Sequence, residues 1–237
     1  MIEDFQLKPP FFELGPKAYL YGKQVLDLAK FADDISAKYR IPIIFTPQFV
    51  DIPQVVSATT NLLVFAQHMD PIRVGRGIGA VLPEALEAAG AVGTLLNHAE
   101  RPLDHEVLHE TILRADEVGL ASMVCAANIA EVEAVSRMNP NIIIAESPEL
   151  IGTGKRAENG GESIEKINQL VWGINPAILV LHAAGINSGQ DVYDVIASGA
   201  QATGSTSGVI KAEDPELMLE EMIGNVRKAW DDTHLQA

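Results

Sequence analysis

The sequence has little cysteine, little positive charge and no long apolar run. Cys125 is the one cysteine in 237 residues, which excludes a framework of intrachain disulfides and fits a reducing compartment. No apolar run reaches the 18 residues that a membrane-spanning helix needs, and the N-terminal MIEDFQLKPP lacks the basic and apolar regions of a signal peptide. We therefore expect a soluble, cytoplasmic protein with no membrane partner.

Basic residues are outnumbered by acidic ones. The chain has 17 Lys and Arg against 32 Asp and Glu, a formal net charge of −15. Because nucleic acids are polyanions, this charge predicts that the protein does not bind them. The net charge does not exclude a small anion as ligand, since backbone N–H groups hold a phosphate whatever the net charge of the chain. Apolar residues at 47% and charged residues at 21% are typical of a globular protein and not of a disordered one.

Short β-type runs alternate with helical patterns along the chain. Most of the runs are too continuously apolar to alternate, which is typical of parallel strands covered on both faces. They lie at residues 11–17, 41–46, 62–67, 91–97, 121–126, 141–146, 177–182 and 201–205. The intervening segments 104–118, 162–174, 191–198 and 215–230 carry apolar residues at helical spacing.

Eight strand–helix units fit either a closed (β/α)8 barrel or a doubly wound open sheet. An open sheet of this length usually has fewer strands and a central switch point, so the count favours the barrel. No linker or change of composition divides the chain. We therefore predict an α/β protein with a single-domain (β/α)8 TIM barrel over residues 1–237.

Polar residues stand at the carboxyl ends of several runs, where such barrels place their functional groups. Lys17 follows Gly15 and Pro16, residues 97–100 read Asn-His-Ala-Glu, Glu146 ends a fully apolar run, and His182 ends another. A lysine in this place is often only solvated, and a histidine only hydrogen-bonded within the structure. An acid that ends an apolar run must be solvated, paired or functional, so Glu146 is the hardest to explain as structure alone.

Two glycine-rich stretches follow the last two runs and predict an anion site. Gly185 lies in the first, and Thr206 and Ser207 precede Gly208 in the second, where small residues let the main chain approach a phosphate. Residues 75–80 match the pattern G-x-G-x-x-A of dinucleotide-binding proteins. About eight residues separate that pattern from its strand, which disfavours the dinucleotide interpretation.

Residues 146–155 read ESPELIGTGK. The Ser-Pro pair and the Gly-Thr-Gly triplet bracket an apolar tip, which is typical of a hinged lid over a site. A phosphate-binding P-loop is excluded, because position 149 would have to be glycine and is glutamate.

Several blocks together resemble one known family. They are FAQHMDPI (65–72), AVGTLLNHAER (91–101), EVGLASMVCAAN (117–128), ESPELIGTG (146–154) and GINSGQDV (185–192). In order and spacing these blocks are similar to the triosephosphate isomerase family, in its shorter archaeal-like branch. The resemblance covers nearly the whole chain.

The resemblance implies an enzyme that interconverts D-glyceraldehyde 3-phosphate and dihydroxyacetone phosphate through an enediolate, with no metal and no organic cofactor. It implies Glu146 as the base, neutral His98 as the electrophile and Lys17 as the cation beside the substrate. It further implies a homo-oligomer, a dimer or tetramer. In the family, the loop that corresponds to residues 75–79 reaches a neighbouring subunit, but the sequence of this loop differs here. The remaining implied residues are those near the substrate or its phosphate, Gly15, Ile151, Gly152, Gly185, Thr206 and Ser207, and the supporting residues Asn97 and Glu100.

The sequence departs from the family at several of these places. Gly15 stands where the family has asparagine, Ala99 where it has serine, and the eighth loop is more polar. Two alternatives therefore stay open, namely an isomerase of another small sugar phosphate and a sugar-phosphate-binding protein with little turnover. If the missing side chain at position 15 limits activity, Gly15→Asn should raise turnover of the triose.

Overall fold

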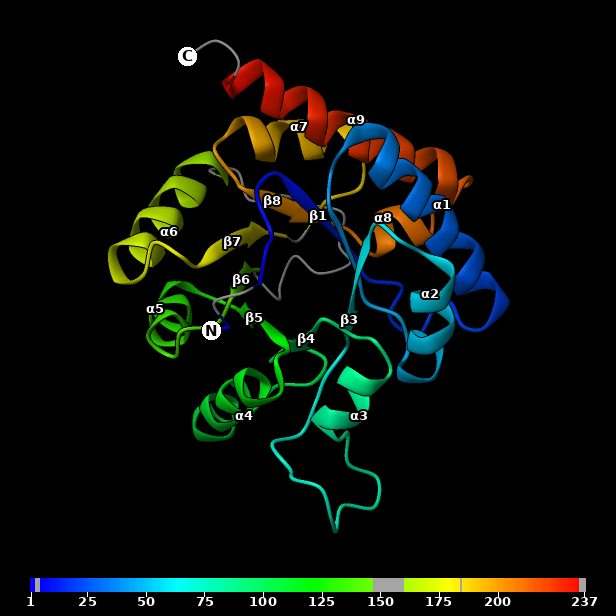
Figure 1. The fold of residues 1–237 in the computed structure, drawn as a ribbon. Helices are drawn as coiled ribbons and strands as arrows, with labels where there is room; N and C mark the ends of the chain where they lie inside the picture. Colours follow the sequence, from blue (N-terminus) through cyan, green and yellow to red (C-terminus); the bar gives the residue numbers. More distant parts are fainter. Residues whose placement is uncertain (3–4, 147–159, 184, 235–237) are drawn as a thin grey trace.

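Eight parallel strands form a closed barrel surrounded by helices (Figure 1). The structure is a computed structural model and describes residues 1–2, 5–146, 160–183 and 185–234. The ring runs in sequence order from β1 to β8, and β8 pairs with β1. The predicted barrel is confirmed, and the open-sheet alternative is wrong. The strands are β1 (Phe11–Leu14), β2 (Ile43–Phe45), β3 (Leu62–Ala66), β4 (Gly93–Leu96), β5 (Ala121–Ala126), β6 (Ile142–Ala145), β7 (Leu179–His182) and β8 (Ala202–Gly204).

The strands are shorter than most of the predicted runs. β1 ends at Leu14 and β6 at Ala145, so Lys17 and Glu146 lie just beyond the last paired residues. β7 begins at Leu179 because Ala177 is still in a turn, where its N–H donates to the side chain of Asn175. Lys17 and Glu146 therefore belong to loops that start at the rim of the barrel, whereas His182 is the last residue of β7.

Helices follow the strands and cover the outside of the barrel. The four predicted helical segments are confirmed with small shifts at their ends, as α4, α6, α7 and α9. The two longest helices, α1 and α9, lie near one another beside β1, and α9 also packs against α7 (Figure 1). The bounds are α1 (Lys23–Tyr39), α2 (Ile52–Ala58), α3 (Pro83–Ala88), α4 (His105–Val118), α5 (Ile129–Arg137), α6 (Gly160–Ile174), α7 (Gly189–Ala197), α8 (Ser207–Ile210) and α9 (Pro215–His234), with a 3-10 turn η1 (Phe49–Asp51) before α2.

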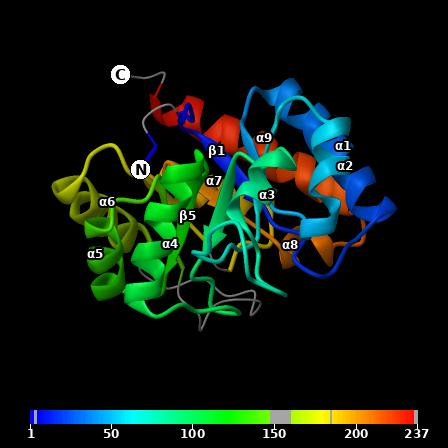
Figure 2. The same ribbon diagram turned by 60° about the horizontal axis from the view of Figure 1, so that its bottom comes forward.

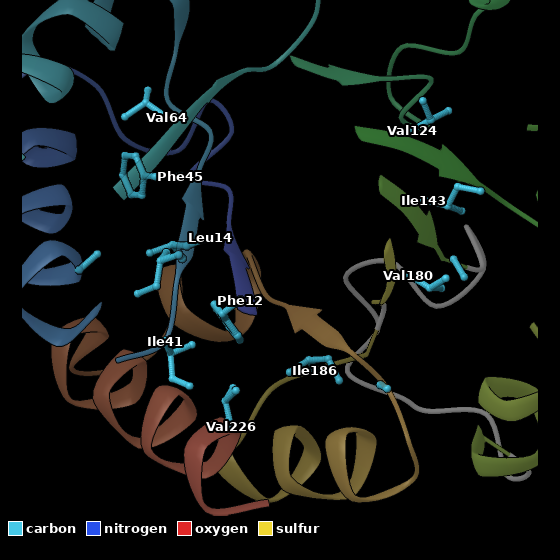
Figure 3. Packing of buried hydrophobic residues seen from close by; sticks show 14 of the residues in the cluster. Phe12, Leu14, Ile41, Phe45, Val64, Val124, Ile143, Val180, Ile186 and Val226 are labelled. Carbon is cyan, nitrogen blue, oxygen red and sulfur yellow. The ribbon is translucent and has the colours of Figure 1, made fainter. Parts of the chain in front are cut away.

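The core has two layers because the side chains of each strand alternate between its faces. Phe12 and Leu14 point outward from β1, and Figure 3 shows them in the layer between strands and helices that also holds Ile41 and Val226. The inner layer fills the barrel with Phe11, Ile44, Phe65, Ala121, Met123, Cys125, Ile142, Ile144, Leu181 and Ala202. By the same alternation Glu13 falls on the inward face of β1.

The connection between β3 and α3, residues 67–82, projects away from the barrel (Figures 1 and 2). It contains the 75–80 pattern, and its residues 73–79 are exposed, so the pattern does not directly join a strand to a helix. Among the described helices, none has the length and apolar character needed to cross a membrane.

Candidate active site

A cavity of about 570 Å³ opens at the carboxyl ends of the strands. Among the described residues, its walls come from β1, β4, β5, β6 and β8 and from the loops after every strand except β5, so residues far apart in the sequence face one space. Of the residues identified from the sequence, it brings together Gly15, Lys17, His98, Glu100, Glu146, Gly185, Thr206 and Ser207.

Lys17 lies in the loop after β1, with its backbone in the left-handed region at φ 49°. Its carbonyl oxygen accepts hydrogen bonds from Gln48 Nε2 at 3.0 Å and from Gln67 Nε2 at 3.1 Å. These two glutamines follow β2 and β3, so neighbouring strands fix the backbone that carries the lysine. The side chain is 25% exposed, and its Nζ donates to Glu100 Oε1 at 2.6 Å.

Glu146 follows β6 directly, and its N–H donates to the carbonyl of Ala126 at 3.1 Å. The side chain is half-buried at the cavity wall. Burial raises the pKa of this carboxyl, the charge of Lys17 lowers it, and the charge of Glu100 raises it again. The result is a carboxylate that is more basic than an exposed glutamate.

His98 lies in the loop after β4 and lines the cavity. Its Nδ1 accepts a hydrogen bond from the N–H of Glu100 at 3.0 Å. Burial lowers the pKa of the imidazole, the charge of Lys17 lowers it further, and the charge of Glu100 opposes both. A neutral ring that accepts at Nδ1 carries its proton on Nε2, so His98 can donate one hydrogen bond.

The two predicted supporting residues differ in that Glu100 lines the cavity and Asn97 does not. The buried Asn97, at φ 57°, donates from Nδ2 to the carbonyl of Cys125 and to Glu131, and accepts from the N–H of Leu103. It fixes the loop that carries His98 and does not line the cavity. Glu100 is at the cavity edge, with a side chain 64% exposed, and forms an ion pair with Lys17.

The loops after β7 and β8 pack tightly against each other. Ser205 Oγ donates to the carbonyl of Ile186 at 2.9 Å, and a Cβ atom at position 208 would lie 2.5 Å from the same oxygen. Thr206 and Ser207 begin the short helix α8, whose first N–H groups have no partner within the helix. Gly185 has φ 73°, a conformation that favours glycine.

Two predicted phosphate residues, Ile151 and Gly152, lie outside the described part of the chain, as do residues 147–155 of the predicted lid.

Four further residues line the cavity that were not predicted from the sequence, namely Glu13, Thr46, Gln48 and Gln67. Glu13 carried a signal, because it is a charged residue within the apolar strand FFEL and on its inward face. The glutamines carried none, since their role depends on how the strands neighbour Lys17 in the barrel.

The other strand-end histidine and the cysteine are structural. His182 is buried and hydrogen-bonded through Nε2 to Asn168 Oδ1 of α6 at 2.9 Å, and burial lowers its pKa to about 4. Cys125 is buried in β5, as its apolar run predicts, and burial raises the pKa of its thiol. Within the described residues, no cluster of three or more His, Cys, Asp or Glu could hold a metal ion.

The barrel and its cavity define a (β/α)8 protein with a half-buried carboxylate, a neutral imidazole and a lysine at one site. A sequence model of the triosephosphate isomerase family matches residues 17–221. The chain is 37% identical to the triosephosphate isomerase of Sulfurisphaera tokodaii, over 95% of this chain and 99% of that protein. It is 36% identical to those of Methanobacterium bryantii and Methanosarcina mazei, over 92% and 90% of this chain and 97% of each relative. The chain belongs to the triosephosphate isomerase family.

The space beside Gly15 is already filled, which reverses the expectation for Gly15→Asn. A Cβ atom there would lie 2.7 Å from Glu13 Oε1 and 2.8 Å from Thr46 Oγ1. We predict that Gly15→Asn lowers stability by about 1–3 kcal/mol, as overpacking does, and does not raise triose turnover. Thermal unfolding checks this, with Gly173→Asn as the control, because a Cβ at 173 meets nothing within 4 Å. A variant with unchanged melting temperature and faster turnover would contradict it.

Proposed function

We propose that the chain, as one (β/α)8 domain over residues 1–237, interconverts D-glyceraldehyde 3-phosphate and dihydroxyacetone phosphate. The observation that carries the proposal is that Glu146, His98 and Lys17, from three different loops, line one cavity in a chain of this family. The reaction moves one proton between adjacent carbons and one between their oxygens. It needs a base, an electrophile and a positive charge.

Glu146 is the base. Its carboxylate takes the proton from C2 of the aldehyde, leaving an enediolate, and returns it to C1 to form the ketone. Burial raises the pKa of Glu146, and this strengthens the carboxylate as a base, while Lys17 opposes the rise and favours the ionised form.

His98 polarises the carbonyl. Its Nε2–H donates to the substrate oxygen and then exchanges protons between the two oxygens as the double bond moves. The hydrogen bond from the N–H of Glu100 to Nδ1 orients the ring for this role.

Lys17 and the backbone hold the anion. The ammonium offsets negative charge on the enediolate and the phosphate, and the N–H groups around Gly185 and at the start of α8 bind the phosphate oxygens. Ile151 and Gly152 of the lid complete this set in the proposal, and Asn97 supports it by holding the loop of His98.

An assay with the purified chain tests the substrate. We predict clear turnover of glyceraldehyde 3-phosphate and much slower turnover of four- and five-carbon sugar phosphates, because Glu13 and Thr46 fill the space beside Gly15 and leave no added room there. A coupled assay with each sugar measures this. Faster turnover of a longer sugar would favour the alternative isomerase, and binding without turnover would favour the binding protein.

The role of the base is tested by Glu146→Asp. Shortening the side chain by one methylene moves the carboxylate away from the carbon it must reach, so we expect kcat to fall by about 100-fold or more with little change in KM. Steady-state kinetics measure both constants. Glu133→Asp is the control, because Glu133 lies on the surface of α5 in an ion pair with Arg137. An unchanged kcat would remove Glu146 from the role of base.

We also propose a homo-oligomer, a dimer or tetramer, formed through the projecting loop 67–82. Val74 is 74% exposed and Ile78 is fully exposed, so this loop presents two large apolar side chains, four residues apart, to the solvent. This surface is what a second copy of the chain would cover.

Sedimentation tests the oligomer. We predict a mass of two or four chains, and a shift to smaller species in Ile78→Asp, because a charge would have to be buried in the interface. Leu217→Asp is the control, since Leu217 is exposed at the start of α9, away from that loop. A monomer at all concentrations, or no effect of Ile78→Asp, would contradict the assignment.

We also propose that the enzyme is cytoplasmic. The one cysteine of the chain is a buried thiol, which suits a reducing compartment.

A further inference from the structure

A carboxyl group that the proposed reaction does not use lies in the same cavity. Glu13 is in the middle of β1, on the face that points into the barrel, among positions that are otherwise apolar. Its side chain lines the cavity. Burying a charged side chain costs free energy unless the charge is paired or hydrogen-bonded. The contacts of the Glu13 carboxyl therefore need to be examined.

Two glycines make room for this carboxyl. A Cβ atom at Gly15 would lie 2.7 Å from Glu13 Oε1, and one at Gly204 would lie 3.1 Å from Oε2 and 3.0 Å from the Cβ of Glu13. Gly204 is the residue of β8 that pairs with Glu13. Any other residue at either position would take the space that the carboxyl occupies. These two glycines, one just after β1 and one in β8, form the slot that holds the carboxyl of Glu13.

The third side of the slot supplies one hydrogen bond. Thr46, just after β2, donates from Oγ1 to Glu13 Oε1 at 3.1 Å. Oε2 has no hydrogen-bond partner among the described residues, and the side chain that carries it lines the cavity. The carboxyl is thus fixed at one oxygen and free at the other.

The charges around the slot favour a proton on this carboxyl. Burial raises the pKa of Glu13, the hydrogen bond from Thr46 lowers it, the negative charge of Glu146 raises it and Lys17 lowers it, to a value of about 7. Cys125 also faces the group, and burial keeps that thiol neutral. While Glu146 carries its negative charge, that charge favours a proton on Glu13.

We propose that Glu13 is a further catalytic residue, which donates a hydrogen bond from Oε2 to an oxygen of the reacting α-hydroxy carbonyl group. The inference rests on the proposed isomerase function and adds a second acid to that site. Glu13 keeps its proton through the reaction, so no bond to it forms or breaks. Its hydrogen bond strengthens as negative charge develops on the substrate oxygen in the enediolate, which is the condition for a contact that accelerates the reaction.

A pair of variants separates this role from one in folding. Glu13→Gln keeps the length and a donor, whereas Glu13→Met keeps the length and has no donor. We expect Glu13→Met to lower kcat by about 100-fold with KM changed by less than about threefold, as for the loss of one donor to a developing oxyanion. Glu13→Gln should recover at least about tenfold of that loss. Steady-state kinetics on glyceraldehyde 3-phosphate, with melting temperatures of both variants, give the comparison.

The pH profile gives a second readout. Loss of the proton from Glu13 removes the donor, so activity of the unmodified chain should fall as pH rises through about 7, the pKa of this group. Glu13→Gln does not titrate and should lose this alkaline limb. Thr46→Val removes the bond that lowers the pKa of Glu13, so it should move the limb to higher pH, and should have no such effect in the Glu13→Gln background.

The outcomes are distinct. If the unmodified chain does not turn over the triose, the proposed function fails first. If it does, and Glu13→Met folds and keeps its kcat, Glu13 is only structural. If Glu13→Met does not fold, the profile of Glu13→Gln decides, because an alkaline limb identical to that of the unmodified chain overturns the proposal, and its loss supports it.

Discussion

The ammonium group of Lys17 lies among four titratable side chains of the cavity, and its charge acts on each of them. It lowers the pKa of three carboxyl groups, whereas burial raises it. It also lowers the pKa of one imidazole, and there burial acts in the same direction. The affected residues are Glu13, His98, Glu100 and Glu146. A positive charge of this kind keeps a carboxylate base ionised and a histidine neutral at the same pH. Without it, the pKa of these carboxyls would be higher, and less of the proposed base would be ionised at a given pH.

The place of this charge depends on the barrel and not on the loop alone. Lys17 has a left-handed backbone, which is disfavoured for a residue with a side chain, typically by about 1 kcal/mol or more. Two hydrogen bonds to its carbonyl, from Gln48 and Gln67, stabilise that conformation. Because each glutamine follows the next strand of the ring, the ammonium is set in place only when β1, β2 and β3 are paired. Folding and the electrostatics of the site are therefore coupled.

Much of the fold and part of the candidate site could be predicted from the sequence. Apolar runs at regular spacing predict the barrel, and polar residues just beyond them predict the cavity, because parallel strands all end at the same rim. The end of a run does not by itself show that a side chain faces the cavity. Alternation along β7 turns His182 outward, like Val180, and it bonds to α6. Asn97 accepts a hydrogen bond within the loop after β4. The slot of Glu13 could not be predicted, since it depends on two missing side chains at opposite ends of the chain.

The structure changes the interpretation of Gly15. In the sequence it is a missing polar side chain beside the lysine, and a missing donor suggests a weakened site. In the structure the volume is occupied by the carboxyl of Glu13 and the hydroxyl of Thr46, two polar groups in contact with each other. The amide of an asparagine at position 15 would donate a hydrogen bond at any pH, whereas the carboxyl of Glu13 donates one only while it is protonated. In the proposed role of Glu13, polar contact with the substrate is kept, but it depends on the charges of Lys17 and Glu146, which act on the pKa of Glu13.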